Sequence, residues 1–311
     1  MNHIGNIIKK LRMDAGISRN VLSKDICSEK YLYLIERGDR SPSAEIIRLL
    51  SYRLGTDLFN YYEYLDCTDP LTVYHAIKDF NICRRLSDFK ELKKQNDNMK
   101  LHPDFLETPW KYEIDVNNAL NSFFLERKPQ ETIDYIESLL NDIDEKFKEE
   151  EFTANLYVIL SRCYQRLGRI NEARSALYSA RKIISSKMNI ARYYQVIITV
   201  KLITMTFANL TEDYDLAIEE GLSIHQLQLK TNIYDRSSYM FYYIAYAYYK
   251  KGMEAEAVEW FEKCLFDLLI HYNPIPVHII SKDDLFYELF FHQEISPSLR
   301  TRIKNIYNRF L

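Results

Sequence analysis

Apolar residues recur with helical spacing along most of this chain. Near its start, Ile4, Ile7, Ile8 and Leu11 fall at positions i, i+3, i+4 and i+7, which places them on one face of an amphipathic helix. Gly16 follows, and glycine is the residue that most often ends a helix, because it adopts a left-handed backbone without a steric penalty. The pattern therefore predicts a first helix that ends before Gly16.

Four more short helices are predicted within the first 65 residues. Ser18, Ser28 and Ser43 each precede an apolar stripe, and a serine at that position caps a helix by accepting a hydrogen bond from a backbone N–H. The stripes consist of Leu22 and Ile26, of Leu32 and Ile35, and of Ile46, Ile47, Leu50 and Leu54. An aromatic-rich fifth helix is predicted over residues 57–65. Such a compact five-helix bundle is the arrangement that places one helix in the major groove of DNA.

Beyond residue 65 the pattern repeats at intervals of about forty residues. Two units have large and small residues in the order of a tetratricopeptide repeat, with a glycine turn between their two helices. They are Tyr157, Leu160, Ser161, Tyr164, Gly168, Ala173, Leu177 and Ala180, and Phe241, Ile244, Ala245, Tyr248, Gly252, Ala257, Phe261 and Cys264. Corresponding positions Thr132, Ala173, Ala217 and Ala257 are 41, 44 and 40 residues apart. These intervals exceed the usual ~34 residues, so the helices are expected to be longer than in the minimal repeat.

Weaker helix pairs are predicted over residues 70–97, 116–139 and 190–226. A final amphipathic helix is expected after Pro297, with Ile303, Ile306, Tyr307 and Phe310 on its apolar face. The predicted fold is all-α, with a DNA-binding bundle over residues 1–65 and a right-handed superhelical array of helix pairs over residues 66–311. The only plausible linker between them is Asp66–Pro70.

The composition limits the classes of function that this protein can have. The formal net charge is −3, so the protein is not basic over its whole surface. Residues 1–64 contain ten Lys and Arg against eight Asp and Glu, a net charge of +2, and DNA affinity must come from where those groups are placed. The five cysteines lack zinc-ligand spacing, so no metal or cofactor is predicted. No segment is apolar enough to span a bilayer, and a cytoplasmic location is expected.

The N-terminal bundle carries a resemblance to a known family. Ile35-Glu36-Arg37-Gly38, followed by Arg40, Pro42 and Ser43, resembles the phage-repressor-like (Cro/C1, or XRE) helix-turn-helix family. The resemblance implies that Arg19 and Ser28 contact phosphate. It also implies that Glu29, Lys30 and Tyr33 face base edges, that Tyr31 is a further DNA-contact candidate, and that Arg37 and Arg40 bind the DNA backbone. Arg12 and Glu36 are expected to form a structural pair. Leu34, where a polar residue is usual, and Arg19, where glutamine is commoner, depart from the family pattern.

The repeat array offers a second candidate site. The first helices of stacked pairs line the concave side, where side-chain amides can bond an extended peptide backbone and tyrosines provide apolar walls with a polar tip. The predicted peptide-binding positions are Asn117, Asn118, Asn121, Asn155, Val158, Arg162, Gln165, Tyr239, Tyr242, Tyr243 and Tyr246. The order of the two domains resembles the peptide-pheromone-responsive regulators of Gram-positive bacteria, the Rgg/PlcR/PrgX (RRNPP) type. That resemblance implies a quorum-sensing homodimer that binds double-stranded DNA at a palindromic operator and is controlled by a short linear signalling peptide.

Two alternatives stay open at this point. The array could bind a partner protein, or its own C-terminal helix, in place of a peptide pheromone. A repeat protein that acts as a response-regulator phosphatase is a less favoured alternative, because no metal cluster, nucleophile–base pair or glycine-rich phosphate loop is present in the sequence. We therefore expect a regulator and not an enzyme.

Overall fold

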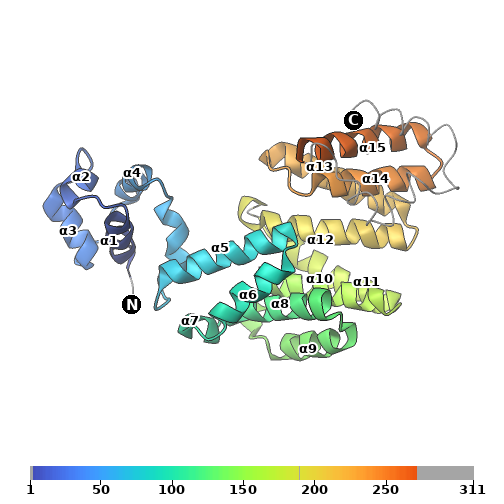
Figure 1. Cartoon of the computed structure of the whole chain (residues 1–311), viewed down its shortest axis with the longest axis horizontal. Helices are drawn as coiled ribbons and strands as arrows, with labels where there is room; N and C mark the ends of the chain where they lie inside the picture. The colour runs from blue at the N-terminus through green and yellow to red at the C-terminus, as the bar shows by residue number, and fades with distance from the viewer. Residues whose placement is uncertain (1–2, 189, 272–311) are drawn as a thin grey trace. The chain divides into compact units, whose positions relative to one another are not determined.

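The computed structural model describes residues 3–188 and 190–271, and helices are the only regular secondary structure within those ranges (Figure 1). The chain divides into two compact units, Met1–Asn141 and Asp142–Leu311. None of the described helices combines the length and the apolar character that crossing a bilayer needs. The prediction of an all-α chain with an N-terminal helical bundle and a series of helix pairs is confirmed.

The first unit begins with the predicted bundle. Its elements are α1 (Ile4–Asp14), α2 (Arg19–Ser23), α3 (Glu29–Arg37), α4 (Ala44–Leu54) and the 3-10 helix η1 (Leu58–Tyr64). All three predicted serine caps form: Ser18, Ser28 and Ser43 accept from the backbone N–H three residues on, at 3.2, 3.1 and 3.3 Å. Each hydroxyl satisfies a donor that has no partner within its helix, which fixes where α2, α3 and α4 start. The fifth predicted helix is present in the tighter 3-10 form.

The core of the bundle holds the predicted stripes. Ile8, Leu22, Leu32 and Ile35 have no exposed surface, so α1, α2 and α3 pack directly against one another. Gly5 makes the closest approach possible, because a Cβ atom there would lie 1.8 Å from the backbone oxygen of Ile35. The α1–α3 contact thus sets the tilt of α3, the helix expected to enter DNA.

The rest of the first unit consists of helices that follow the bundle in the chain, and the first of them packs against η1. They are α5 (Pro70–Leu86), α6 (Phe89–Met99), α7 (Pro103–Leu106), α8 (Lys111–Asn121), the π-helical η2 (Ser122–Glu126) and α9 (Pro129–Asp142). The predicted pairs over residues 70–97 and 116–139 correspond to α5 with α6 and to α8 with α9. Asp69 caps α5 with its carboxylate, and α5 leads from the bundle to the later helices (Figure 1).

The predicted linker is held in place. The carboxylate of Asp104 accepts from the backbone N–H of Thr68 at 2.7 Å, from the Thr68 hydroxyl at 2.9 Å and from the backbone N–H of Asp69 at 3.0 Å. Tyr64, at the end of η1, stacks on Trp110 with ring centroids 4.8 Å apart. The expected domain boundary after residue 65 therefore lies inside the first unit. There, α5 packs directly against the bundle.

The second unit is a series of helix pairs. Its elements are the 3-10 helix η3 (Glu145–Phe147), α10 (Glu151–Arg166), α11 (Ile170–Ser185), α12 (Ile190–Leu210), α13 (Tyr214–Thr231), α14 (Ser237–Lys250) and α15 (Glu254–His271). Each odd-numbered helix packs on the even-numbered helix before it, and α10, α12 and α14 also pack against one another in series. The small residues Ala173, Ala217 and Ala257 are buried at these contacts, as the repeat pattern predicts. The helix expected after Pro297 lies outside the described residues.

Candidate functional site

The helix expected to read DNA presents its N-terminal half to solvent. Ser28, Glu29, Lys30 and Tyr33 are exposed on or next to α3. Exposed lysine and glutamate side chains at the start of such a helix can reach base edges, where lysine donates to guanine and glutamate accepts from cytosine. Arg37 and Arg40, at and beyond the end of α3, are exposed as well. The structure thus gathers the predicted DNA-contact residues around one short helix.

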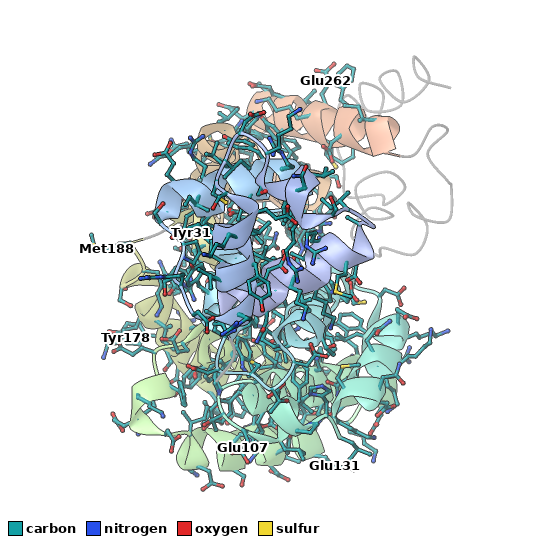
Figure 2. The ribbon with its side chains drawn as sticks, turned by 90° about the vertical axis from the view of Figure 1, so that its left-hand side faces the viewer. Tyr31, Glu107, Glu131, Tyr178, Met188 and Glu262 are labelled. Atoms are coloured by element: carbon teal, nitrogen blue, oxygen red, sulfur yellow. The ribbon has the colours of Figure 1, made fainter. Side chains whose placement is uncertain are left out.

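Tyr31 has a different environment from the other predicted DNA contacts. It is half-buried, it packs against the bundle core, and its hydroxyl donates to the backbone oxygen of Ser41 at 3.3 Å. Figure 2 labels Tyr31 on the bundle. Leu34 is half-buried too. Tyr31 thus helps to hold the loop after α3 against the bundle, which is a packing role.

A buried carboxylate joins α1, α2 and α3. Glu36 accepts from Arg12 through Nε at 2.7 Å and through Nη2 at 3.2 Å, which confirms the expected pair. It also accepts from Arg19 Nε at 2.6 Å, a contact that the sequence pattern did not indicate. Burial alone would raise the pKa of Glu36, but the hydrogen bonds and charges of Arg12 and Arg19 outweigh burial and hold the pKa below its ordinary value. Glu36 is therefore ionised in the folded bundle at neutral pH.

Arg53 is a residue that sequence reasoning missed. From α4, its guanidinium donates to the backbone oxygens of Val21 at 3.3 Å and Leu22 at 3.2 Å, and also to that of Lys24. These carbonyls at the end of α2 have no partner within so short a helix. Arg53 thus fixes the turn between α2 and α3. The role of Arg53 depends on its position opposite that turn in the folded bundle, and the sequence alone does not give this position.

The three predicted amide ligands of α8 are largely used within the first unit. Asn117 has no exposed surface; its carboxamide donates to Asn96 Oδ1 at 3.0 Å and accepts from Arg84 at 2.6 and 2.9 Å. Asn118 is exposed but accepts from Asn96 Nδ2 at 2.8 Å, and Asn121 is buried. Because these amides bond to neighbouring helices, Asn117 and Asn118 are better assigned to the packing of α5, α6 and α8.

In the second unit, some predicted peptide positions are also part of the core. Val158 and Tyr242 are buried, Tyr242 completely. Gln165 is half-buried and donates to the Ser161 hydroxyl at 3.0 Å within α10. Asn155 and Tyr246 are half-buried and keep part of their surface in contact with solvent. A side chain without exposed surface cannot contact a ligand in this conformation, so Tyr242 acts in packing here. Val158, with 5% of its surface exposed, is largely used in the same way.

Three of the predicted residues do come together. Arg162 on α10 interacts electrostatically with Tyr239 and Tyr243 on α14. Burial lowers the pKa of Arg162, and the two tyrosines oppose that shift. The rings of Tyr239 and Tyr243 lie 4.7 Å apart, and the Tyr239 hydroxyl donates to that of Tyr243 at 3.4 Å. Helices that are separate in the sequence thus place a guanidinium beside two phenols.

Two further contacts, which the repeat pattern did not indicate, join α12 to residues in or next to α14. Arg236, directly before α14, donates to the Thr199 hydroxyl on α12 at 3.4 Å. The carboxamide of Asn209, near the end of α12, donates to the backbone oxygen of Tyr243 at 3.4 Å. We call Arg162, Thr199, Arg236, Tyr239 and Tyr243 the first-helix cluster. It combines cationic donors, a hydroxyl and aromatic rings, which are groups that can bind a polar, extended ligand.

Comparison with known proteins agrees with this architecture. Residues 8–59 match the helix-turn-helix family, and no curated protein matches the chain in sequence. The chain is similar to PlcR of Bacillus thuringiensis, whose structure was determined with the peptide PapR7 and DNA: 17% identity, a TM-score of 0.63, and coverage of 92% of this chain and 99% of that one. It is also similar to a putative transcriptional regulator of Listeria monocytogenes EGD-e, with 12% identity, a TM-score of 0.53, and coverage of 92% and 98%.

At these identities the structural likeness establishes the fold, whereas function has to be argued from the sites. The helix-turn-helix match covers residues 8–59, and modules of this kind place their second helix in the major groove of DNA. The described residues contain no group of three His, Cys, Asp or Glu side chains arranged to hold a metal ion.

Proposed function

We propose that this chain is a cytoplasmic transcription regulator controlled by a short signalling peptide. The premise is that it is a helix-turn-helix DNA-binding protein with the whole-chain fold of PlcR. In this proposal α3 enters the major groove of a palindromic operator. Two copies of the chain bind together, one on each half-site, because a palindrome mirrors the symmetry of a protein dimer. The peptide binds in the repeat region and serves as the quorum-sensing signal.

One observation carries the DNA-binding part. Lys30 and Glu29 are exposed at the start of a helix whose position is fixed by a serine cap and by Arg53. A side chain must be held within a fraction of an ångström to distinguish one base edge from another, and rigid elements provide that precision. Arg37 and Arg40, exposed nearby, are suited to bind phosphates and thereby fix the register of the helix on DNA.

The first-helix cluster supports the peptide part. Its guanidiniums, phenols and hydroxyl come from α10, α12 and α14, so a ligand bound there would contact three successive repeats. PlcR, which has the same fold, was crystallised with a peptide. For such a ligand to regulate DNA binding it has to favour one conformation of the protein over another, because equal affinity for both would shift nothing.

The test begins with selection of the preferred DNA sequence from a random duplex library by the purified full-length protein. Wild-type protein is expected to bind the selected duplex at least about a thousandfold more tightly than random duplex. Lys30→Ala removes a base contact, so it should lose about 1–3 kcal/mol of that discrimination while leaving affinity for random duplex nearly unchanged. Lys90→Ala, at an exposed lysine of α6, is the matched control.

The same assay tests peptide control. Peptides that co-purify with the protein from its native host are identified by mass spectrometry, synthesised and added to the binding reaction. We expect one of them to change operator affinity in the wild type but not in the Arg162→Ala variant. Unchanged discrimination in Lys30→Ala would contradict the DNA-reading assignment. Co-purification of a folded protein in place of a peptide would contradict the peptide assignment and favour a protein partner.

A further inference from the structure

Tyr33, near the middle of α3, lies beside two arginines that come from different ends of the DNA-reading module. The Cζ atom of Arg19, at the start of α2, is 5.3 Å from the centroid of the Tyr33 ring. The Cζ atom of Arg37, at the end of α3, is 5.4 Å from the same centroid. A guanidinium within about 6 Å of an aromatic ring is attracted by the negative charge of the ring face. One ring therefore stabilises two cations.

Each arginine has a second anchor, a carboxylate. Arg19 Nε donates to Glu36 Oε2 at 2.6 Å, and Glu36 is itself fixed because it is buried and bonded to Arg12. Arg37 Nη1 donates to the Tyr33 hydroxyl at 3.3 Å, and Arg37 Nη2 forms an ion pair with Asp39 at 2.7 Å. These contacts restrict side chains that would otherwise sample many rotamers, so less conformational entropy is lost when the two arginines bind a ligand.

The anchors leave donors available for a ligand. The hydrogen bond to Glu36 uses only the Nε–H of Arg19, and the side chain of Arg19 is one-third exposed. Its terminal Nη groups are the donors that bind phosphate oxygens in pairs. Tyr33, in contrast, already accepts from Arg37 at its hydroxyl and has both guanidiniums at its ring. The ring and the hydroxyl acceptor of Tyr33 are thus already engaged by the two arginines.

We propose that Tyr33 is a positioning residue that holds Arg19 and Arg37 as a pair of DNA-phosphate ligands, and that it does not select bases. The inference rests on the proposed function, since it assumes that α3 binds DNA. It changes the expected role of Tyr33 from reading base edges to setting affinity for the backbone. It also gives Arg19 a defined geometry, through Tyr33 and Glu36.

The test is a double-mutant cycle in the full-length protein. Affinity for the selected operator and for random duplex is measured over a series of salt concentrations in the wild type, in Tyr33→Ala, in Tyr33→Phe, in the Arg19→Ala/Arg37→Ala variant and in that variant with Tyr33→Ala. Circular dichroism establishes that each variant is folded. Tyr33 is 40% exposed, so its truncation leaves the bundle core intact.

Tyr33→Ala is expected to weaken binding to operator and to random duplex by the same factor, about tenfold, which corresponds to two exposed cation–π contacts. The slope of log affinity against log salt should fall by roughly one to two, as expected when one or two phosphate contacts are lost. Tyr33→Phe keeps the ring and should stay within about threefold of the wild type. In the background without both arginines, Tyr33→Ala should change affinity by less than about twofold, because the groups through which it acts are absent.

Three results would overturn the inference. A loss of operator affinity with unchanged affinity for random duplex would make Tyr33 a base reader. An undiminished effect of Tyr33→Ala in the background without the arginines would show that Tyr33 contacts DNA itself. Failure of the wild type to bind any duplex would remove the proposed function and this inference together, whereas the first two results would leave DNA binding in place.

Discussion

The two units of the molecule each bury a glutamate between two cations, and they use it differently. In the N-terminal bundle Glu36 binds Arg12 and Arg19 at 2.7 and 2.6 Å. In the second unit Glu220, on α13, binds Arg181 from α11 at 2.8 Å and Lys201 from α12 at 2.9 Å. Glu36 joins a core arginine to a surface arginine of the DNA-reading module, whereas Glu220 joins three successive helices of the repeat.

The two glutamates differ in how far their cationic partners are exposed to solvent. The side chain of Arg12 is 10% exposed, whereas the side chains of Arg181 and Lys201 are 45% and 25% exposed. A cation that reaches water is hydrated when its partner is lost, but a buried cation is left without compensation. The burial of the partner, and not that of the carboxylate alone, therefore decides how much stability such a pair controls.

The largest effect is expected for Glu36→Gln, which leaves the charge of Arg12 buried without its counter-ion. The free energy of unfolding of the first unit should fall by about 3 kcal/mol, near the lower end for a broken buried ion pair. Urea unfolding followed by tryptophan fluorescence in a Trp260→Phe background measures it, because Trp110 then remains as the reporter within the first unit. Glu29→Gln, at an exposed glutamate of the same helix, is the control and should change little.

The pH dependence of this difference provides its check. The pKa of Glu36 is lowered in the folded state, so its stabilisation is complete above the ordinary glutamate pKa of about 4.3 and is lost as the pH falls through the lower folded-state value. Glutamine does not titrate. The stabilities of the wild type and Glu36→Gln should therefore begin to converge as the pH falls below about 4.3, and a difference that stays constant down to pH 2 would contradict the assignment.

A smaller effect is expected for Glu220→Gln. Because Arg181 and Lys201 both reach solvent, the loss in the free energy of unfolding should be about 1–2 kcal/mol. Fluorescence of Trp260 in a Trp110→Phe background reports on the second unit. Glu219→Gln, at the exposed neighbour on α13, is the matched control. A loss as large as that of Glu36→Gln would refute the argument from partner exposure.

The smallest effect on stability is expected for Asp39→Asn, which removes an exposed carboxylate from Arg37. Exposed ion pairs contribute at most about 1 kcal/mol, so the free energy of unfolding should change by less than about 0.5 kcal/mol. Affinity for DNA should instead rise by roughly two- to fivefold at low salt, because the loss of a negative charge next to the phosphates outweighs the loss of one anchor of Arg37, which Tyr33 still holds. The gain should shrink as salt is added. Electrophoretic mobility shift at two salt concentrations measures both. Weaker binding would mean that Asp39 orients Arg37 productively.

Periodicity predicted the elements of this fold well, and the reason is physical. Ile8, Leu32 and Ile35 had to be buried for α1 and α3 to form an amphipathic pair, and glycine and serine at the expected positions ended and started the helices. The Arg12–Glu36 pair followed from the family resemblance. These features depend on spacing along the chain or on a motif, and both can be read in the sequence.

Contacts between side chains of separate helices could not be predicted in that way. The pattern placed Asn117 on a first helix, but its amide bonds to Asn96 on α6 and Arg84 on α5, and only packing brings those helices together. The pairing of Arg19 with Glu36, the partners of Glu220 and the position of Arg236 are of the same kind. Periodicity determines which face of a helix is polar; it does not determine which polar groups satisfy one another.

The joint between η1 and α5 restricts the DNA sites that such a protein can use. Thr68 and Asp69 bond to Asp104, and Tyr64 stacks on Trp110, so the bundle is held against α7 and α8 within the first unit. A DNA-binding bundle on a flexible linker would tolerate half-sites at many separations. In the proposed dimer, an operator with a few base pairs inserted between its half-sites would leave one of the two recognition helices on the wrong side of the double helix.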